Sequence, residues 1–402
     1  MNTLVGISLA VAALMADGAG AQGQAGARPR ARDVGIVIGV FEPGPLDAIT
    51  DVAGVRVGQI TVHAGDTVNT GVTAILPHPG NVFQDRVPAG LFVMNGFGKL
   101  LGVTQLQENA ELETPILLTC TLCVWRAADA MVAYLLGQPG MEEVRSINPV
   151  IGETNDGGLN DIRLRPITEA DVRSALEGAR GGPVDEGSVG AGTGTQALGW
   201  KGGIGTSSRR IPPAYGSYTV GVLVQTNFGG VLSINGAPVG RELGRHAFRT
   251  TLGLPAEPLG NEGLGSCMVV VATDAPLSPH DLERLAKRAA LGLGRAGSFA
   301  GPGSGEYVLA FSTAESVRRH RAPPGPGLHP ATYIELRHDE LAPLFEAVVE
   351  ATEEAVVNSL FRATPVTYRG HAVDAIPIDR TVAVLERYHA LHWDRTLGGP
   401  TR

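Results

Sequence analysis

The sequence has few of the residues on which several common kinds of protein depend. Three cysteines among 402 residues are too few for a disulfide framework. The one close pair, Cys120 and Cys123, has no second pair or histidine cluster nearby to complete a zinc site. We interpret the pair as two small buried residues, with a disulfide or redox pair as the alternative in an exported protein. No His-Glu-x-x-His motif and no Ser/His/Asp spacing stands out, so we expect no metal or cofactor.

Basic surface and long apolar runs are also scarce. The formal net charge is −8, and no stripe of lysine and arginine interleaved with aromatic residues indicates nucleic-acid binding. The first residues, MNTLVGISLAVAALMADGAGAQ, contain an apolar run followed by a small-x-small pattern at 19–21, which is typical of a signal peptide. No other stretch reaches the roughly 18 apolar residues of a membrane span. We therefore expect a soluble protein exported to the periplasm or medium. Because no lysine or arginine precedes the run, a cytoplasmic protein with a frayed N-terminus is the alternative.

What the sequence does contain indicates a globular α+β protein. Hydrophobic residues make up 43% and charged residues 18%, which is enough apolar material for a buried core. Glycine, with 55 residues, has about twice its usual share, and this predicts many tight turns and close backbone approaches. We expect a polar tether at 22–33 and a single domain at 34–402.

Strand and helix patterns are mixed along the whole chain. We predict strands at 35–40, 71–76, 267–273 and from Tyr307, and another strand ending at Thr119. Helical spacing begins at Val124 and returns at 341–360 and in a terminal helix from 379. A glycine-dense loop system from 178 to 205 separates a short helix from the strand YTVGVLVQTN. A helix that begins after Ser278 has the clearest start, with that serine as cap, proline next, and Asp281 completing a capping-box variant.

Two glycine-rich segments match the spacing of a dinucleotide-binding motif but lack its structural context. GTGTQA at 192–197 and GLGRAG at 292–297 match the spacing. The motif requires a strand before it and a helix after it, so that a pyrophosphate meets the helix N-terminus. The first pattern lies inside a predicted loop and the second ends a helix. We therefore reject both as nucleotide sites.

The segment NEGLGSCMVVVATDAPL places a Gly-Ser pair in a glycine-rich loop directly before an apolar strand. If the Ser266 hydroxyl attacks the Gly265 carbonyl, the peptide bond becomes an ester that water can hydrolyse, leaving Ser266 as a new N-terminus. The new α-amine, with a usual pKa of about 7.7 to 8.0, is partly uncharged near neutral pH and can act as the local base. On spacing alone, a turn that leads into a strand is the favoured explanation of the pair, because such pairs are common.

Several other segments make the chain resemble a known family. The segments that follow one another along the chain in the family's order are VIGETNDGGLNDIR, VGAGTGTQALGWKGGIGTSSR, VQTNFGG, NEGLGSCMVVVATDAPL and GSGEYVLAFSTA. Together they resemble the DmpA-type L-aminopeptidase/D-esterases and β-peptidyl aminopeptidases. The likeness runs from about residue 41 to 382. It implies an αββα sandwich in which a precursor is cut before a catalytic serine, here Ser266, into chains 22–265 and 266–402. It also implies a homo-oligomer of four processed protomers that acts on small peptides, amides or esters.

The resemblance also assigns roles to other residues. The family's supporting serine and acid fall on Ser304 and Glu306, where the hydroxyl can hydrogen-bond the nucleophile or the amine and the carboxylate can pair with a charged amine. Asn227 matches the family's asparagine, whose amide can donate to an oxyanion. Glu153 is the candidate for the ammonium of the substrate, whereas Asn155 and Asp156 are interpreted as turn residues. Without the family motifs, a turn, a strand start and a strand cap would explain Ser304, Glu306 and Asn227.

Two details depart from the family, and other functions stay open. Some relatives carry an aromatic residue where this chain has Gly158, and relatives often have an aliphatic residue at Cys267, which should point away from Ser266 into the core. An amidase of pantetheine-like substrates or an acyltransferase could share this fold, although the acetyltransferases use threonine as nucleophile. A non-catalytic exported binding protein is the alternative from another class. The preference for α- or β-amino acids and for L or D centres is not encoded in any motif.

Overall fold

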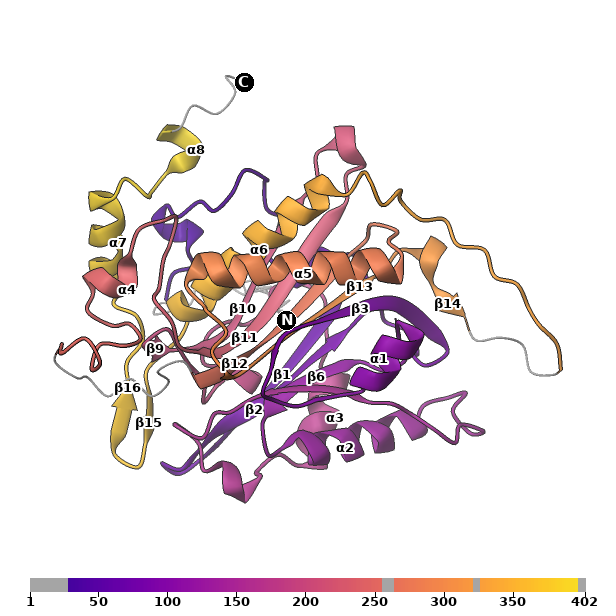
Figure 1. Cartoon of the computed structure of the whole chain (residues 1–402). Coiled ribbons are helices and arrows are strands. Elements are labelled where there is room, and N and C mark those ends of the chain that lie inside the picture. The colour runs from indigo at the N-terminus through magenta and orange to yellow at the C-terminus, as the bar shows by residue number, and fades with distance from the viewer. Residues whose placement is uncertain (1–27, 255–263, 321–325, 397–402) are drawn as a thin grey trace, which may run out of the picture.

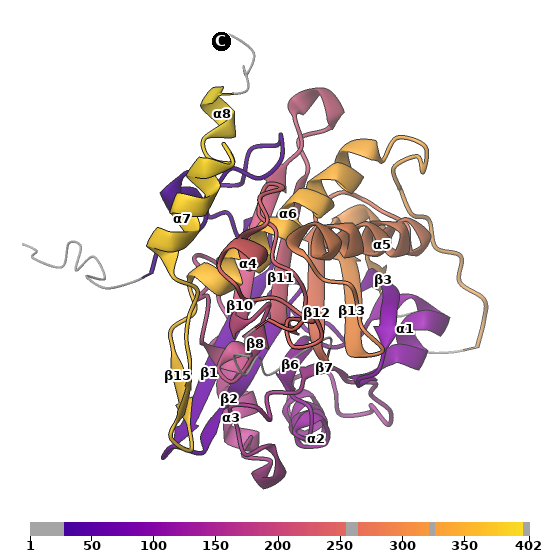
Figure 2. The ribbon, with the colours of Figure 1, turned by 60° about the vertical axis from the view of Figure 1, so that its left-hand side comes forward.

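Two β-sheets packed face to face form the centre of the molecule, and helices cover the outer face of each sheet (Figures 1 and 2). The computed structural model describes residues 28–254, 264–320 and 326–396. The expected signal peptide at 1–21 and residues 22–27 of the expected tether lie outside the described residues. The order of the layers is helix, sheet, sheet, helix, which confirms the αββα sandwich and the α+β class.

The larger sheet has seven strands and carries the expected cleavage point on a central strand. Its order is β10-β11-β12-β13-β3-β14, with β5 paired to β3. Strand β12 is antiparallel to β11 and parallel to β13. The strands span Gly203–Arg210 (β10), Thr219–Phe228 (β11), Leu264–Thr273 (β12), Gly303–Ser312 (β13), Asp85–Gly96 (β3), Arg319–His320 (β14) and Glu111–Leu112 (β5).

The smaller sheet has five strands in the order β1-β2-β6-β7-β4. Strand β6 is parallel to β7, whereas the pairings of β1 with β2, β2 with β6 and β4 with β7 are antiparallel. Contacts between β7 and β12 join the two sheets. The strands span Arg56–Ala64 (β1), Val68–Leu76 (β2), Ile116–Cys120 (β6), Val150–Thr154 (β7) and Leu100–Leu101 (β4).

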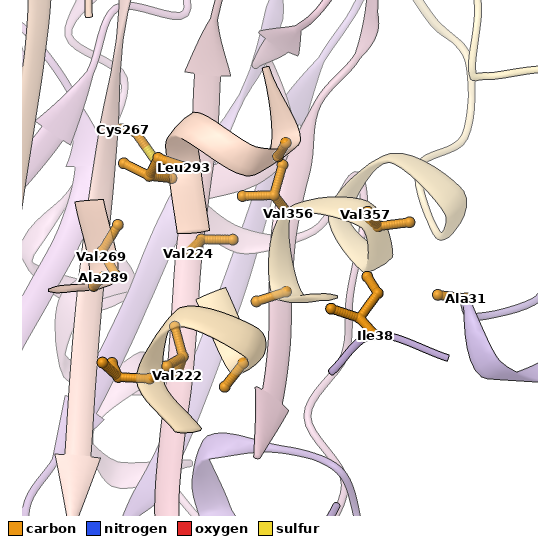
Figure 3. Packing of buried hydrophobic residues seen from close by; sticks show 14 of the residues in the cluster. Ala31, Ile38, Val222, Val224, Cys267, Val269, Ala289, Leu293, Val356 and Val357 are labelled. Atoms are coloured by element: carbon orange, nitrogen blue, oxygen red, sulfur yellow. The ribbon is translucent and has the colours of Figure 1, made fainter. Parts of the chain in front are cut away.

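The layers enclose three hydrophobic cores, because successive side chains along the central strands point to opposite faces of their sheet. On β12, Cys267 and Val269 face the helices, whereas Met268 and Val270 face the smaller sheet. Figure 3 shows part of the core between the larger sheet and its helices, to which Cys267 and Leu293 both belong. A third core lies between the smaller sheet and its own helices. The four main helices are α5 (Pro279–Ala296) and α6 (Ala342–Phe361) on the larger sheet, and α2 (Val124–Leu136) and α3 (Glu169–Glu177) on the smaller.

The remaining elements are short and lie around this sandwich. The predicted cap of α5 is present, because the Ser278 side chain accepts a hydrogen bond from the Asp281 amide at 3.1 Å. Within the described ranges, no helix combines the length and the apolar character needed to cross a membrane. The short elements are α1 (Val103–Asn109), α4 (Val239–Glu242), α7 (Ile378–Arg387), α8 (Trp393–Thr396), β8 (Gln196–Ala197), β9 (Trp200–Lys201), β15 (Val366–Tyr368), β16 (His371–Val373) and the 3-10 turn η4 (Gly190–Gly192).

The N-terminal part of the domain differs from the sequence expectation. Residues 35–40 form no strand, although Ile36 and Ile38 are buried, because their apolar side chains fill the helix-side core without pairing to a sheet. The expected tether overlaps an ordered segment from Arg28 onward. Ala31 is fully buried, Arg30 forms an ion pair with Glu186, and Arg32 forms one with Glu354. The arginines that make this segment look polar are therefore what fixes it to the domain.

Candidate active site

The Gly265–Ser266 bond lies inside β12, which begins at Leu264. Asn227 and Phe228 pair with the two residues on one side, and Ser304 and Gly305 pair with them on the other. Ser266 is 5% exposed. The expectation of an exposed loop before a strand starting at Cys267 is therefore wrong. The strands on both sides extend beyond the apolar run, so they supply backbone partners to residues that the hydrophobic pattern does not include.

Gly265 has a backbone conformation that other residues rarely adopt. Its φ is +136°, and a Cβ at this position would lie 2.0 Å from the Asn227 carbonyl oxygen. A side chain would therefore both strain the backbone and collide with β11. The residue expected on the acyl side of the cleaved bond is thus held in an unusual geometry directly before the serine. Such outliers gather at functional sites, because the surrounding structure must enforce them.

Asn227 lies directly opposite Ser266 on the neighbouring antiparallel strand. Residues opposite each other in such a pair project from the same face, with Cβ atoms about 4.5–5.5 Å apart. The amide is almost fully buried, and Nδ2 donates to the Asn155 carbonyl at 3.0 Å while Oδ1 accepts from the Gln196 N–H at 3.0 Å. Nδ2 carries a second hydrogen. In the described part of the chain no acceptor for that hydrogen is present, so it is available on the Ser266 side of the sheet.

Ser304 and Glu306 flank Gly305, which is in register with Ser266. The Ser304 hydroxyl donates to a Glu306 carboxylate oxygen, and the other oxygen of Glu306 is buried without a hydrogen bond among the described residues. Burial raises the pKa of Glu306, and the hydrogen bond from Ser304 opposes that rise. Alternation places both side chains on the face of Cys267, whose thiol pKa is also raised by burial and by Glu306. The pair therefore lies beside the Ser266 backbone and not beside its hydroxyl.

Glu153, near the end of β7, is buried. Its Oε1 accepts from the Lys99 N–H at 2.9 Å and lies 3.3 Å from Lys99 Nζ, whereas Oε2 is buried without a partner in the described residues. The loop 97–99 brings this carboxylate near the serine. A Cβ on Gly98 would lie 3.2 Å from Glu153 Oε1 and 3.4 Å from the Cα of Gly305. A carboxylate with one unused oxygen in this position can receive an ammonium group.

The turn after β7 contains one expected feature and one unexpected feature. Asn155 is a turn residue, since its Oδ1 accepts from the Gly157 N–H at 3.0 Å. Asp156 is instead 1% exposed and accepts from Thr70 Oγ1 at 2.6 Å, and burial raises its pKa to about 6. At Gly158, a Cβ would lie 2.3 Å from Gln196 Nε2. The Gln196 side chain therefore occupies the space that a side chain at 158 would enter.

Sequence reasoning missed three residues of this region. Phe97 is 71% exposed, although its N–H donates to the Ser304 carbonyl at 3.1 Å. Lys99 contacts Glu153, and Lys201 is completely buried in the turn system before β10. Lysine inside the otherwise apolar segments GFGKLLG and GWKGG was the available signal, because a lone charge in such a context needs a partner.

The cysteines divide as a disulfide pair and a free thiol. Cys120 and Cys123 are both buried and form a disulfide, so the alternative left open by the sequence is the observed one. Cys123 is the N-cap of α2, which places the bridge between β6 and this helix. Cys267 is buried in the helix-side core, as expected. Across residues 28–254, 264–320 and 326–396, no cluster of three histidine, cysteine or acidic residues could hold a metal ion.

Comparison with known proteins identifies relatives over nearly the whole chain. The model of "Peptidase family S58" matches residues 47–373. A β-peptidyl aminopeptidase, BapA, of Sphingosinicella microcystinivorans is 40% identical over 395 residues, which cover 94% of this chain and 96% of the relative.

Solved structures give the same relationship. A β-aminopeptidase from a Burkholderia species superposes with a TM-score of 0.81 and 39% identity, over 89% of this chain and 99% of that one. The L-aminopeptidase D-Ala-esterase/amidase of Ochrobactrum anthropi gives a TM-score of 0.78 and 37% identity, over 90% of this chain and all of that one. That structure is described as a prototype of the serine aminopeptidases and as a variant of the Ntn hydrolase fold.

Proposed function

Because the chain belongs to peptidase family S58 and is a self-processing serine aminopeptidase, we propose that it cuts itself at Gly265–Ser266 and then uses Ser266 as its nucleophile. The observation that carries this assignment is the junction itself. A strained glycine precedes a buried serine. The serine lies opposite the Asn227 amide, whose Nδ2 has one hydrogen without an acceptor among the described residues.

Maturation follows from the position of this bond. The Ser266 hydroxyl adds to the Gly265 carbonyl carbon, the C–N bond breaks, and the serine nitrogen takes the proton. Water then hydrolyses the ester, which leaves a carboxylate on Gly265 and a free amine on Ser266. The unusual φ of Gly265 supports this step, because breaking the bond releases the constraint on the residue before the serine.

Turnover uses the same hydroxyl with the new amine as base. The amine accepts the proton of Ser266 as its oxygen attacks the acyl carbonyl of the substrate, and Asn227 Nδ2 donates to the oxyanion. The leaving amine takes the proton, and water hydrolyses the acyl-enzyme. The nitrogen of Ser266 is a backbone atom in the plane of the sheet, so Ser304 and Glu306 on the adjacent strand are better placed for this amine than for the hydroxyl.

The substrate we propose is a short peptide, amide or ester with a free N-terminal amine, including those that begin with a β-amino acid. Glu153 supports the amine requirement, because its buried Oε2 has no partner in the described residues and can bind an ammonium. The similarity to β-peptidyl aminopeptidases at about 40% identity supports the inclusion of β-amino acids. A panel of β-alanyl, L-alanyl and N-acetyl-alanyl p-nitroanilides tests both points, and hydrolysis of the N-acetylated compound would contradict the requirement for an amine.

A denaturing gel tests the cleavage point. Wild type should migrate as two chains that end and begin at Gly265 and Ser266, whereas Ser266→Ala should remain one inactive chain. Ser266→Thr is the matched control, because it keeps a hydroxyl at this position and should still cut itself, more slowly. An uncut wild type, or a cut Ser266→Ala, would contradict the assignment. Mass spectrometry of the smaller chain identifies its first residue.

We also propose an exported homo-oligomer of four processed protomers. The Cys120–Cys123 disulfide supports export, since such bonds persist in oxidising compartments. Exposed large apolar side chains such as Trp125 and Phe248 support association. Cell fractionation with N-terminal sequencing tests the first point, and light scattering of the purified enzyme tests the second. An intact N-terminus on cytoplasmic enzyme, or a processed monomer in solution, would contradict the respective proposal.

A further inference from the structure

The Asn227 amide is oriented by two backbone groups from loops of the structure. Its oxygen accepts from the Gln196 N–H, and its nitrogen donates to the Asn155 carbonyl. One Nδ2 hydrogen is thereby fixed, and the direction of the other follows from the planar geometry of the amide. The direction in which Asn227 donates is therefore only as well defined as these two loops.

Lys201 joins both ends of the loop that carries Gln196. Its side chain is completely buried, and Nζ donates to the carbonyls of Gly192 and Gly202, each at 2.8 Å. The Gly192 carbonyl also accepts from Thr195 Oγ1 at 3.0 Å. Gln196 and Lys201 are themselves paired across the β8–β9 hairpin. The ammonium thus holds segment 192–202 closed around the residue that fixes Asn227 Oδ1.

Asp156 does the same for the loop that carries Asn155. Its carboxylate accepts from Thr70 Oγ1 at 2.6 Å and from Asn160 Nδ2 at 3.0 Å, which closes the turn directly after Asn155. It also touches the other loop, since a Cβ on Gly194 would lie 3.1 Å from the Cβ of Asp156. The two loops that grip the Asn227 amide are therefore packed against each other through this side chain.

Both charged groups are held in an environment that disfavours charge. Burial lowers the pKa of Lys201 to about 7, an effect that the nearby Asp156 opposes, and burial raises the pKa of Asp156 to about 6. Removing such groups from water is unfavourable, and apolar residues of similar size are often as good for stability. Neither residue has a part in the nucleophile, amine or ammonium chemistry. Their contacts lead instead to the two groups that orient Asn227.

We propose that Lys201 and Asp156 are positioning residues that hold the Asn227 amide in the orientation that stabilises the oxyanion. The inference rests on the proposed role of Asn227 and deepens it. Neither residue touches the reacting atoms. Their loss should therefore reduce the rate of the chemical step and leave binding of the substrate amine by Glu153 unchanged.

A double-mutant cycle tests this role. All enzymes are produced by co-expressing a chain that ends at Gly265 with one that begins at Ser266, so that turnover does not depend on self-cleavage. Asn227→Ala should lower kcat by roughly 100- to 1000-fold, the loss found for one oxyanion donor elsewhere. Lys201→Met should lower kcat by roughly 10- to 100-fold with KM changed by less than about twofold. In the Asn227→Ala background, Lys201→Met should lower kcat by less than about twofold further.

Two further variants separate positioning from stability. Arg209→Met removes another fully buried cation, one that contacts Glu350 and Glu354 in the helix-side layer. It should reduce thermal stability with kcat of the folded enzyme unchanged. Asp156→Asn keeps a hydrogen-bond acceptor for Thr70 and should retain more activity than Asp156→Leu. If Lys201→Met does not assemble, the two Asp156 variants still distinguish a positioning role from a purely structural one.

Different results would contradict the positioning role of Lys201 and Asp156 and the proposed role of Asn227. Equal losses from Lys201→Met with and without Asn227 would overturn the inference, as would an unchanged kcat in a less stable Lys201→Met enzyme. Equal activity of Asp156→Asn and Asp156→Leu would also count against it. A fully active Asn227→Ala enzyme would instead overturn the proposed role of Asn227, and with it the reason for a positioning device.

Discussion

Ser304 donates a hydrogen bond to Glu306, and the two side chains flank the residue of β13 that is in register with Ser266. Both side chains project from the face of β13 opposite to that of Gly305. They therefore lie beside the backbone nitrogen of Ser266. After the proposed cleavage before Ser266, this nitrogen is an amine. A carboxylate whose second oxygen is free among the described residues can then hold the amine in place and respond to its charge.

Glu306 should give the enzyme an acid limb in its pH profile. Burial raises the pKa of this carboxyl, so it becomes neutral at a higher pH than an exposed glutamate, and kcat/KM should fall as pH decreases through that raised value. Glu306→Gln should lose at least about tenfold in kcat/KM at neutral pH and should lack this limb.

The folding stability of Glu306→Gln should not decrease together with its activity. Because the pKa is raised, the neutral carboxyl is favoured in the folded state, and its contribution to stability is lost as pH rises through the folded pKa. Glu306→Gln should therefore be at least as stable as wild type at neutral pH. A pH–rate series together with thermal unfolding measures both effects, with the exposed Glu335→Gln as control. An unchanged acid limb in Glu306→Gln would assign that limb to another group.

Much of the scaffold could be predicted because its signals are local. The cap at Ser278, the helical spacing after Val124 and the apolar run of β12 depend on neighbouring residues, and each gives the element expected. The family motifs pointed to Ser266, Asn227 and Glu153. The structure pairs Asn227 with Ser266 and places Glu153 beside the loop 97–99, which also contacts Gly305.

The features that were missed depend on contacts distant in sequence. The pattern 35–40 is as apolar as a strand, and only packing against α6 shows that its residues fill the core without pairing. The strand start at Leu264 is fixed by β11 and β13. Asp156 is indistinguishable from a surface charge until folding brings the Thr70 hydroxyl to it.

A buried network of ionisable side chains holds the N-terminal segment against α6. We expect one of its carboxyl groups to be protonated near neutral pH. Three arginines (Arg30, Arg32, Arg209) contact four carboxyl groups (Asp47, Glu186, Glu350, Glu354) in this network. One proton balances the charge. Burial and the Glu354 charge raise the pKa of Asp47 to about 8, whereas Arg209 and Arg32 hold the pKa of Glu354 at about 2 despite its burial. Asp47 is therefore the group that holds the proton near neutral pH.

Asp47→Asn should make folding stability less sensitive to alkaline pH. The stability that neutral Asp47 contributes is fully present below its ordinary pKa of 3.8 and is lost as pH rises toward about 8. Asparagine stays neutral, so the variant should retain on the order of 2 kcal/mol more of its stability than wild type between about pH 5 and 9. Urea unfolding at both pH values measures this, with exposed Glu108→Gln as control. Parallel losses in wild type and Asp47→Asn would place the proton elsewhere.

The Cys120–Cys123 disulfide should contribute modestly to stability and little to catalysis. The two cysteines are separated by only 3 positions, and closing so short a loop stabilises by about 2 kcal/mol at most. Cys120→Ser/Cys123→Ser should therefore fold, process itself and keep kcat within about twofold. Because both sulfur-bearing residues are buried, a reductant should reach the native bond slowly. Thiol alkylation followed by mass spectrometry, with and without urea, measures this, and rapid labelling of the native enzyme would show an accessible bond.

Phe97 should select substrates by the side chain of the residue that is released. Its N–H donates to the Ser304 carbonyl, and its own carbonyl oxygen lies 3.0 Å from where a Cβ on Gly305 would be. Two residues later, Lys99 contacts Glu153, the candidate ammonium ligand. The backbone of Phe97 therefore lies between β13 and the ammonium site, and the residue is 71% exposed. An apolar side chain of the substrate residue can cover the Phe97 ring and remove both surfaces from water.

Phe97→Ala should accordingly lower kcat/KM for substrates with apolar side chains and leave kcat/KM for small substrates nearly unchanged. The loss of this contact should cost about 1–2 kcal/mol, or roughly 5- to 30-fold in kcat/KM, for leucyl and β-homoleucyl p-nitroanilides. Glycyl and β-alanyl p-nitroanilides should change by less than about twofold, since they have no side chain to cover the ring. Tyr215→Ala removes an exposed aromatic residue from the turn between β10 and β11, and it should affect none of these substrates. Equal losses on leucyl and glycyl substrates would show that Phe97 supports the loop at Glu153 and does not read the side chain.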